Sequence, residues 1–63
     1  MTKKDHQNRL KFLYDYLELI HRYPIHYRNN FGNKGLEDEI NRILDEINFT
    51  KKQLIKFDKN DNQ

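Results

Sequence analysis

The sequence has no cysteine, a single proline and two glycines, and it also lacks alanine, valine, serine and tryptophan. Without cysteine the chain can form neither a disulfide, nor a thiolate nucleophile, nor a cysteine zinc site. Without serine it lacks a common hydroxyl nucleophile. No hydrophobic run approaches the ~20 residues of a membrane span or the length of a signal-peptide core. We therefore expect a soluble, cytoplasmic protein.

What the chain does contain is a balance of polar and apolar residues over a short length. It has 63 residues, of which 35% are charged and 35% hydrophobic, so we expect one small folded domain over 1–63. A core of this size seldom supplies more than about 3 to 5 kcal/mol without a disulfide, a metal or an oligomer. The abundance of asparagine, lysine and isoleucine follows AT-rich codons, which suggests a low-GC bacterium or one of its phages or plasmids.

Two segments have the hydrophobic period of an α-helix, and the first covers about 3–22. One stripe of this segment consists of Leu10, Leu13, Leu17 and Ile20. A second, neighbouring stripe consists of Phe12, Tyr16, Leu19 and Tyr23. Together they cover roughly half of the helix circumference, whereas a surface helix needs an apolar arc of only about 100°. The second stripe therefore predicts either a homodimer interface or a docking face for a different protein.

The second periodic segment covers about 36–57 and keeps a heptad-like pattern. Its core positions are Leu36, Ile40, Ile43, Ile47, Thr50, Leu54 and Phe57, and Leu44 and Ile55 widen the stripe. Both patterns together predict an all-α fold, a two-helix antiparallel hairpin with a long connector. We expect two such hairpins to pair into a dimeric four-helix bundle.

Local signals set the boundaries of the two helices. Thr2 can cap the first helix together with Asp5, three residues on, and Pro24 should end it. Gly32 and Gly35 give the chain the freedom to turn into the second helix. We expect a loop over about 23–35 and a polar tail over 58–63.

The connector is unusually rich in large side chains. Its hydrophobic residues are Tyr23, Ile25, Tyr27 and Phe31, and they alternate with His26, Arg28 and several asparagines. Such a segment either folds back over the end of the hairpin or presents a binding surface. The sequence leaves both interpretations open, with the first favoured because small bundles need every apolar group.

Motifs for catalysis or metal binding are not evident. His6, His21 and His26 do not have ligand spacing on one helix face. The acidic residues Glu37, Asp38, Glu39, Asp45 and Glu46 are typical of a solvated helix face near a helix N-terminus. We therefore expect no enzymatic activity, no catalytic residues, no metal and no cofactor.

These features favour an interaction protein that regulates or inhibits a protein partner. The predicted partner-binding residues are Phe12, Tyr16, Tyr23, Ile25, His26, Tyr27, Arg28 and Phe31. The alternative is a small nucleic-acid-binding regulator, because an antiparallel hairpin gathers many cations at its open end. The residues of this lysine-rich pole are Lys3, Lys4, Arg9, Lys11, Lys51, Lys52, Lys56 and Lys59.

Overall fold

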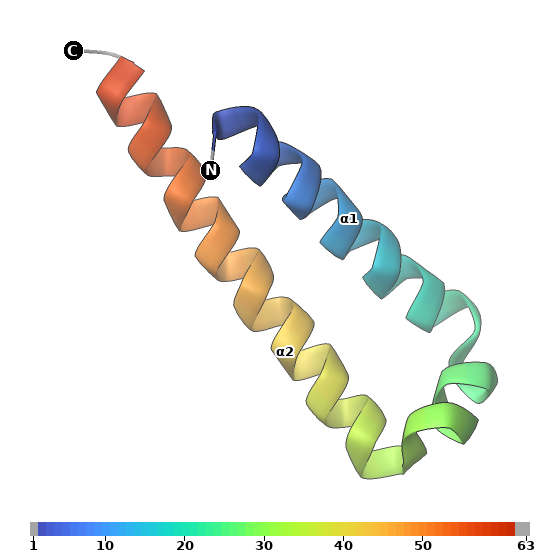
Figure 1. Cartoon of the computed structure of the whole chain (residues 1–63). Coiled ribbons are helices and arrows are strands. Elements are labelled where there is room, and N and C mark those ends of the chain that lie inside the picture. The colour runs from blue at the N-terminus through green and yellow to red at the C-terminus, as the bar shows by residue number, and fades with distance from the viewer. Residues whose placement is uncertain (1, 62–63) are drawn as a thin grey trace.

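A computed structural model describes the backbone of residues 2–61 and the side chains of residues 2–58. This part of the chain forms two helices, α1 (Lys3–Arg22) and α2 (Pro24–Asp61). They run antiparallel and pack against each other (Figure 1). The prediction of an all-α helical hairpin is confirmed. No helix in the described part of the chain is long and apolar enough to cross a membrane.

Helix α1 begins and ends where local chemistry dictates. The Thr2 side chain accepts a hydrogen bond from the Asp5 N–H at 3.2 Å, and the Asp5 carboxylate accepts one from the Thr2 N–H at 3.0 Å. This reciprocal capping box satisfies backbone donors that the first turn leaves unpaired, and it lowers the pKa of Asp5. At the other end Tyr23 occupies the C-cap, because Pro24 disfavours an α conformation at the preceding residue.

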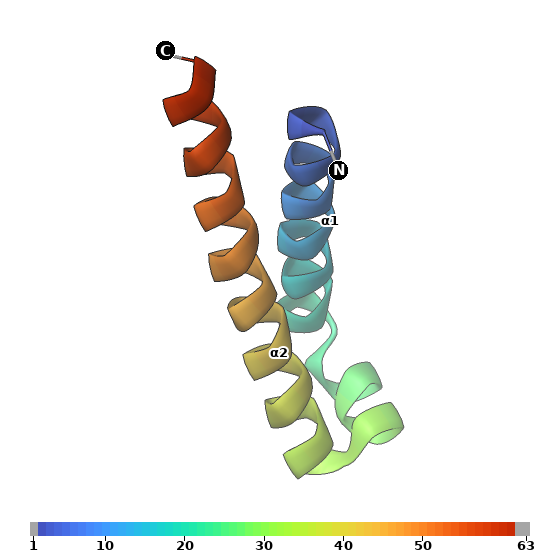
Figure 2. The ribbon, with the colours of Figure 1, turned by 60° about the vertical axis from the view of Figure 1, so that its left-hand side comes forward.

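The connector differs from the loop expected over 23–35, because α2 already begins at Pro24. Pro24 both ends α1 and begins α2. Proline suits the first turn of a helix because the N–H that it lacks would have no bonding partner there. The helical geometry is interrupted at Gly32, with φ 77° and ψ 168°. This conformation is essentially restricted to glycine, and it redirects the chain between 24–31 and the remainder of α2. Figure 2 shows the short segment 24–31 beside the end of α1.

The C-terminal boundary also differs from the sequence prediction. The expected polar tail, 58–63, is helical as far as Asp61, and residues 62–63 lie outside the described part of the chain. Helix α2 therefore continues past the end of its apolar pattern at Phe57. A run of polar residues without proline or glycine offers nothing to stop a helix that is already formed.

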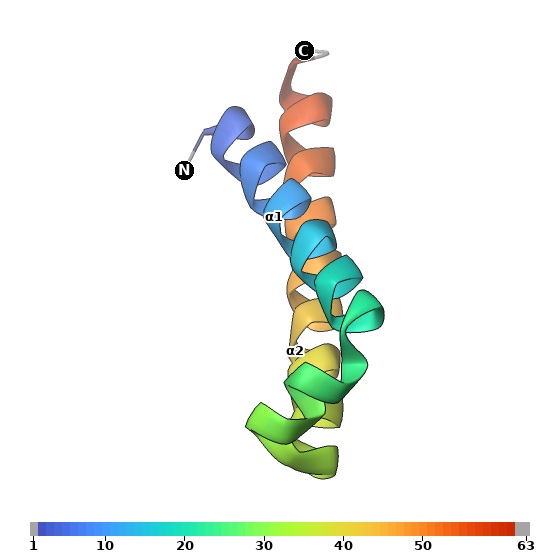
Figure 3. The same ribbon diagram turned by 90° about the vertical axis from the view of Figure 1, so that its right-hand side faces the viewer.

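The core lies in the single seam between α1 and the long part of α2. Its buried residues are Leu13, Ile20, Leu36, Ile43 and Ile47, and the partly buried residues packed against them are Leu10, Tyr16, Leu17, Tyr27 and Ile40. The hairpin measures 49 × 16 × 16 Å, which is one layer of helices. Figure 3, a view from the side, shows α1 lying over α2 with no further element on either flank in the described residues. Side chains on the outer faces of the two helices are therefore not covered by another described element of the chain.

Candidate interaction surfaces

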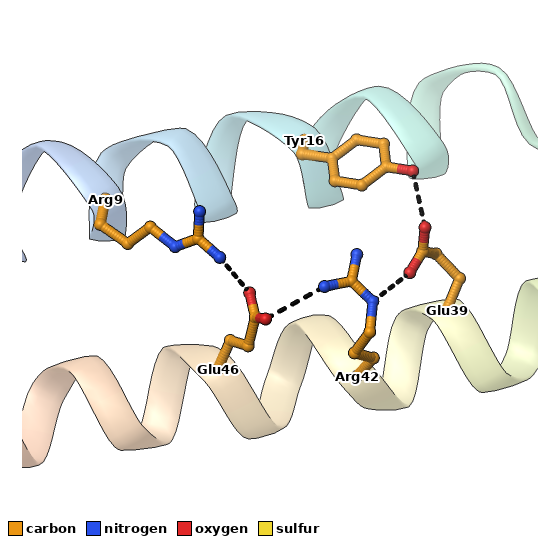
Figure 4. Close-up of polar contacts among 5 residues, drawn as sticks. All are labelled: Arg9, Tyr16, Glu39, Arg42 and Glu46. Atoms are coloured by element: carbon orange, nitrogen blue, oxygen red, sulfur yellow. Dashed lines mark hydrogen bonds and ion pairs between the residues drawn. The ribbon is translucent and has the colours of Figure 1, made fainter.

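A polar network crosses the seam on one side of the hairpin (Figure 4). The Arg9 guanidinium donates to the Glu46 carboxylate at 2.7 Å. The Arg42 guanidinium donates to Glu46 at 3.1 Å and to Glu39 at 2.6 Å. The Tyr16 hydroxyl completes the chain by donating to Glu39 at 3.1 Å. This side of the molecule is called the network face below.

The network favours the ordinary charge states of two of its members, Glu39 and Tyr16. Donation from Arg42, reinforced by the Tyr16 hydroxyl, lowers the pKa of Glu39. Burial raises the pKa of Tyr16, and its hydrogen bond to Glu39 acts in the same direction. Ionised carboxylates and a neutral phenol suit a structural network, whereas a general acid or base needs a pKa shifted towards neutrality.

Large hydrophobic side chains border this network. Phe12 lies three residues after Arg9 and four before Tyr16, so it shares their side of α1. It is 58% exposed, and Tyr23, further along the same stripe, is 53% exposed. The second apolar stripe of α1 is thus largely uncovered within one chain, except for Tyr16, which is half-buried.

Helix α2 adds an aromatic residue that the sequence analysis did not single out. Phe49 lies three residues after Glu46 and seven after Arg42, which places it on the network face, and it is 62% exposed. The sequence does indicate this exposure, because Phe49 lies outside the heptad core positions and therefore does not face the seam. The network face therefore draws hydrophobic side chains from both helices.

The opposite side of the hairpin has a different composition. The Lys51 ammonium lies 5.7 Å from the centre of the Tyr14 ring, which shows that these residues share one side of the seam. Leu44 and Ile55 lie seven residues before and four after Lys51, and they are 43% and 53% exposed. Leu10 is four residues before Tyr14 and only partly buried. We call this side the aliphatic face.

The connector divides between covering and exposed residues. Tyr27 packs on the core and meets the Tyr16 ring edge-on, with ring centres 6.1 Å apart. Ile25 and Phe31, by contrast, are 70% and 42% exposed. His26 is exposed and contacts the Tyr27 ring and the Asn30 amide. Tyr27 therefore covers the end of the hairpin, whereas Ile25, His26 and Phe31 remain exposed, and a binding role for them stays a prediction.

The cations of the lysine-rich pole do not form one continuous surface. Lys3 pairs with Asp58 at 2.8 Å, and Arg9 and Lys51 have the partners described above. The remaining described cations, Lys4, Lys11, Lys52 and Lys56, are exposed. Lys4 and Lys11 lie on the outer face of α1, and Lys52 and Lys56 lie on the outer face of α2, so the two pairs point away from each other. The side chain of Lys59 lies outside the described residues.

Metal ligands do not converge in the part of the chain with described side chains, where no group of three or more histidine or acidic residues could hold an ion. His6 lies at the open end of the seam, 9% exposed, with its ring centre 5.5 Å from that of Phe57. This contact gives His6 a packing role.

In the described part of the chain one open hollow lies in the seam, and another lies within α2, between Arg28 and the residues that follow Gly32. One of about 360 Å³ at the open end is lined by His6, Arg9, Glu46, Phe49 and Thr50. The other, of about 400 Å³ near the connector, is lined by Arg28, Asn33, Leu36, Glu37, Ile40 and Asn41. Both are within the volume range of sites that accept a side chain or a small ligand.

Comparison with known protein families, curated proteins and solved structures finds no match to this chain.

Proposed function

We propose that the chain is a non-enzymatic, cytoplasmic interaction protein that regulates or inhibits a protein partner through the aromatic stripe of α1 and the connector. The supporting observation is the ratio of exposed to buried hydrophobic side chains. Among the described residues nine large hydrophobic side chains are at least 42% exposed, whereas five hydrophobic residues are buried. A monomeric protein seldom leaves so much of its apolar surface in water unless that surface binds something.

The network face has the composition of an interface that must also exist in water. Phe12, Tyr23 and Phe49 supply apolar area, while the adjacent ion pairs keep the face hydrated when no partner is bound. Interfaces between proteins that fold separately combine aromatic anchors with a polar rim in this way. This surface is therefore the proposed partner site, together with the exposed connector residues Ile25 and Phe31.

Photo-crosslinking tests this proposal. Phe12 and, in a second variant, Tyr23 are each replaced by the photoreactive analogue p-benzoylphenylalanine, and the protein is irradiated in an extract of its source cells. We expect a crosslinked product heavier than a dimer of the chain. The same analogue at Asp45, on the outer face of α2, is the matched control and should give no product. Equal yields from both positions, or none from Phe12 and Tyr23, would contradict the proposal.

We also assign the aliphatic face to self-association. A homodimer there would cover Leu44 and Ile55 without burying the ion pairs of the network face, whose desolvation would cost free energy. This arrangement leaves the aromatic stripe available to the protein partner. Sedimentation equilibrium over a wide concentration range should give twice the mass of one chain.

The alternative, binding to nucleic acid, rests on the exposed lysines Lys4, Lys11, Lys52 and Lys56, which lie in two separate pairs on the outer faces of the helices. The measurement is retention on heparin and on random duplex DNA at two salt concentrations. Phosphate contacts made by several lysines predict retention at low salt and a steep loss as salt rises. If neither heparin nor random duplex DNA retains the chain at low salt, this alternative is wrong.

A further inference from the structure

We propose that the connector end of the hairpin binds an acidic peptide segment, with one carboxylate on Arg28 and an adjacent apolar side chain in the hollow over Leu36 and Ile40. This inference rests on the proposed function and specifies the chemistry of the partner. It comes from a juxtaposition at one end of the molecule: an arginine without a carboxylate, an apolar hollow beside it, and exposed hydrophobic side chains nearby.

The connector itself carries charge of one sign. No aspartate or glutamate occurs between Leu19 and Leu36, whereas this stretch contains Arg22, Arg28 and Lys34. Arg22 is already paired with Glu18 at 2.7 Å. Arg28 and Lys34 are exposed and have no ion pair within the described residues.

Arg28 differs in this respect from the other arginines. Arg9, Arg22 and Arg42 each donate to a carboxylate of the chain at 2.6 to 2.7 Å. Among the residues with described side chains, Arg28 alone of the four arginines lacks such a contact. A guanidinium presents donors in a planar fork that matches a carboxylate, so a carboxylate from another chain is the ligand that Arg28 fits.

The hollow beside Arg28 adds an apolar requirement. Leu36 is 7% exposed and Ile40 is partly buried, so they form an apolar floor, while Asn33 and Asn41 supply amide groups that can bond a peptide backbone. Glu37 also lines the hollow, which disfavours a run of carboxylates there. One carboxylate on Arg28 followed or preceded by an apolar side chain satisfies both conditions.

The exposed hydrophobic residues favour a peptide over nucleic acid or a membrane. Ile25 and Phe31 would stay in water if Arg28 contacted only a phosphate backbone. An anionic bilayer would cover them, but it would also bring its negative charge against Glu37, which lines the hollow beside Arg28. A peptide can do both at once, since its apolar side chains can cover these residues and also enter the hollow.

The test begins with selection of random displayed peptides of about 12 residues on the immobilised full chain. We expect enriched sequences to carry Asp or Glu next to Leu, Ile or Phe. The most enriched peptide is then labelled, and fluorescence anisotropy gives its Kd for the wild type, Arg28→Glu and Lys52→Glu. Lys52→Glu is the matched control, because it makes the same charge change at an exposed cation distant from the connector. Circular dichroism checks that both variants stay helical.

We expect Arg28→Glu to weaken binding about tenfold or more and Lys52→Glu to change it by less than about twofold. Replacing the acidic residue of the peptide by its amide should reproduce the loss. Equal weakening by both variants, enrichment of peptides without acidic residues, or no enrichment at all would overturn the inference. So would tighter, Arg28-dependent binding of an RNA of about 20 nucleotides or of phosphatidylglycerol vesicles.

Failure of this inference is distinguishable from failure of the proposed function. If peptide binding does not depend on Arg28 but is lost in Phe12→Ser, the inference of an acidic ligand is wrong. The proposal of an interaction protein is then retained. Absence of a crosslink from both Phe12 and Tyr23 would remove the proposed function regardless of what the peptides show.

Discussion

Ile43 is fully enclosed at the centre of the seam, with 0% of its surface exposed. Truncating such a side chain removes buried methyl groups and leaves a cavity, which typically costs about 2 to 5 kcal/mol. This equals most or all of the stability available to a domain of this size, about 3 to 5 kcal/mol. We therefore expect Ile43→Ala to be largely unfolded at room temperature.

Urea unfolding followed by circular dichroism measures this effect. Ile25→Ala is the matched control, because the same truncation at a side chain that is 70% exposed and lies outside the aliphatic face should change the free energy of unfolding by less than about 1 kcal/mol. Similar losses at both positions would mean that the enclosure of Ile43 in the seam does not decide the stability of the hairpin.

Glu39 makes stability depend on pH. Its pKa is lowered in the folded chain, chiefly by the Arg42 guanidinium, so the ionised form stabilises the fold above the unfolded value of about 4.3. This contribution disappears as the pH falls through the lower, folded pKa. We expect Glu39→Gln to have a smaller drop in Tm than the wild type between about pH 7 and about pH 3.

Thermal unfolding at a series of pH values checks the prediction. Glu37→Gln is the control, since the exposed Glu37 has no ion pair within the described residues. Some acid sensitivity should remain in Glu39→Gln, because capping lowers the pKa of Asp5 as well. Identical pH profiles for the wild type and Glu39→Gln would show that the network contributes nothing.

At the scale of the element, the connector depends on one glycine. Gly32 has φ 77° and ψ 168°, a conformation that costs other residues about 1 to 3 kcal/mol, so Gly32→Ala should destabilise the hairpin by about that amount. Gly35 lies within α2 at an ordinary helical position, and a Cβ there would lie 3.4 Å from the Phe31 Cβ, a normal contact. Gly35→Ala should be neutral or stabilising by up to about 1 kcal/mol.

Chemical denaturation of the two variants under the same conditions provides the comparison. We expect the free energy of unfolding to fall in Gly32→Ala and to stay the same or rise in Gly35→Ala, although both variants add the same methyl group. Equal effects would mean that the kink at Gly32 does not persist in solution.

The seam was predictable from sequence because its information is periodic. Leu36, Ile43 and Ile47 recur at helical spacing, and they are the residues that the structure buries. The connector was harder, because its proline and glycines were interpreted as signals for a loop. Pro24 is equally suited to the first turn of a helix, and within α2 the helical geometry is interrupted at Gly32.

The network face was harder still, because periodicity does not say which side chains bond across a seam. Glu39, Arg42 and Glu46 have the spacing of local pairs on one helix, and that much is visible in the sequence. The reach of Arg9 and Tyr16 from α1 depends on the axial register of the two helices. That register is a property of the packed hairpin, which the sequence pattern alone does not specify.

At the scale of the whole molecule, self-association should make thermal stability depend on concentration. Dimer formation stabilises the folded state by mass action, so we expect the Tm to rise between about 1 and about 100 µM chain. Leu44→Glu, which places a charge on the aliphatic face, should lower the Tm and remove this dependence. Phe12→Glu, on the network face, should retain it.

Differential scanning calorimetry of the three proteins over this range distinguishes the possible assemblies. If Phe12→Glu removes the dependence and Leu44→Glu keeps it, the aromatic stripe is the dimer interface and cannot also be a free partner site. A wild-type Tm independent of concentration, together with the mass of one chain, would leave both faces exposed in a folded monomer. In that case the nine exposed hydrophobic side chains would all be available to other proteins.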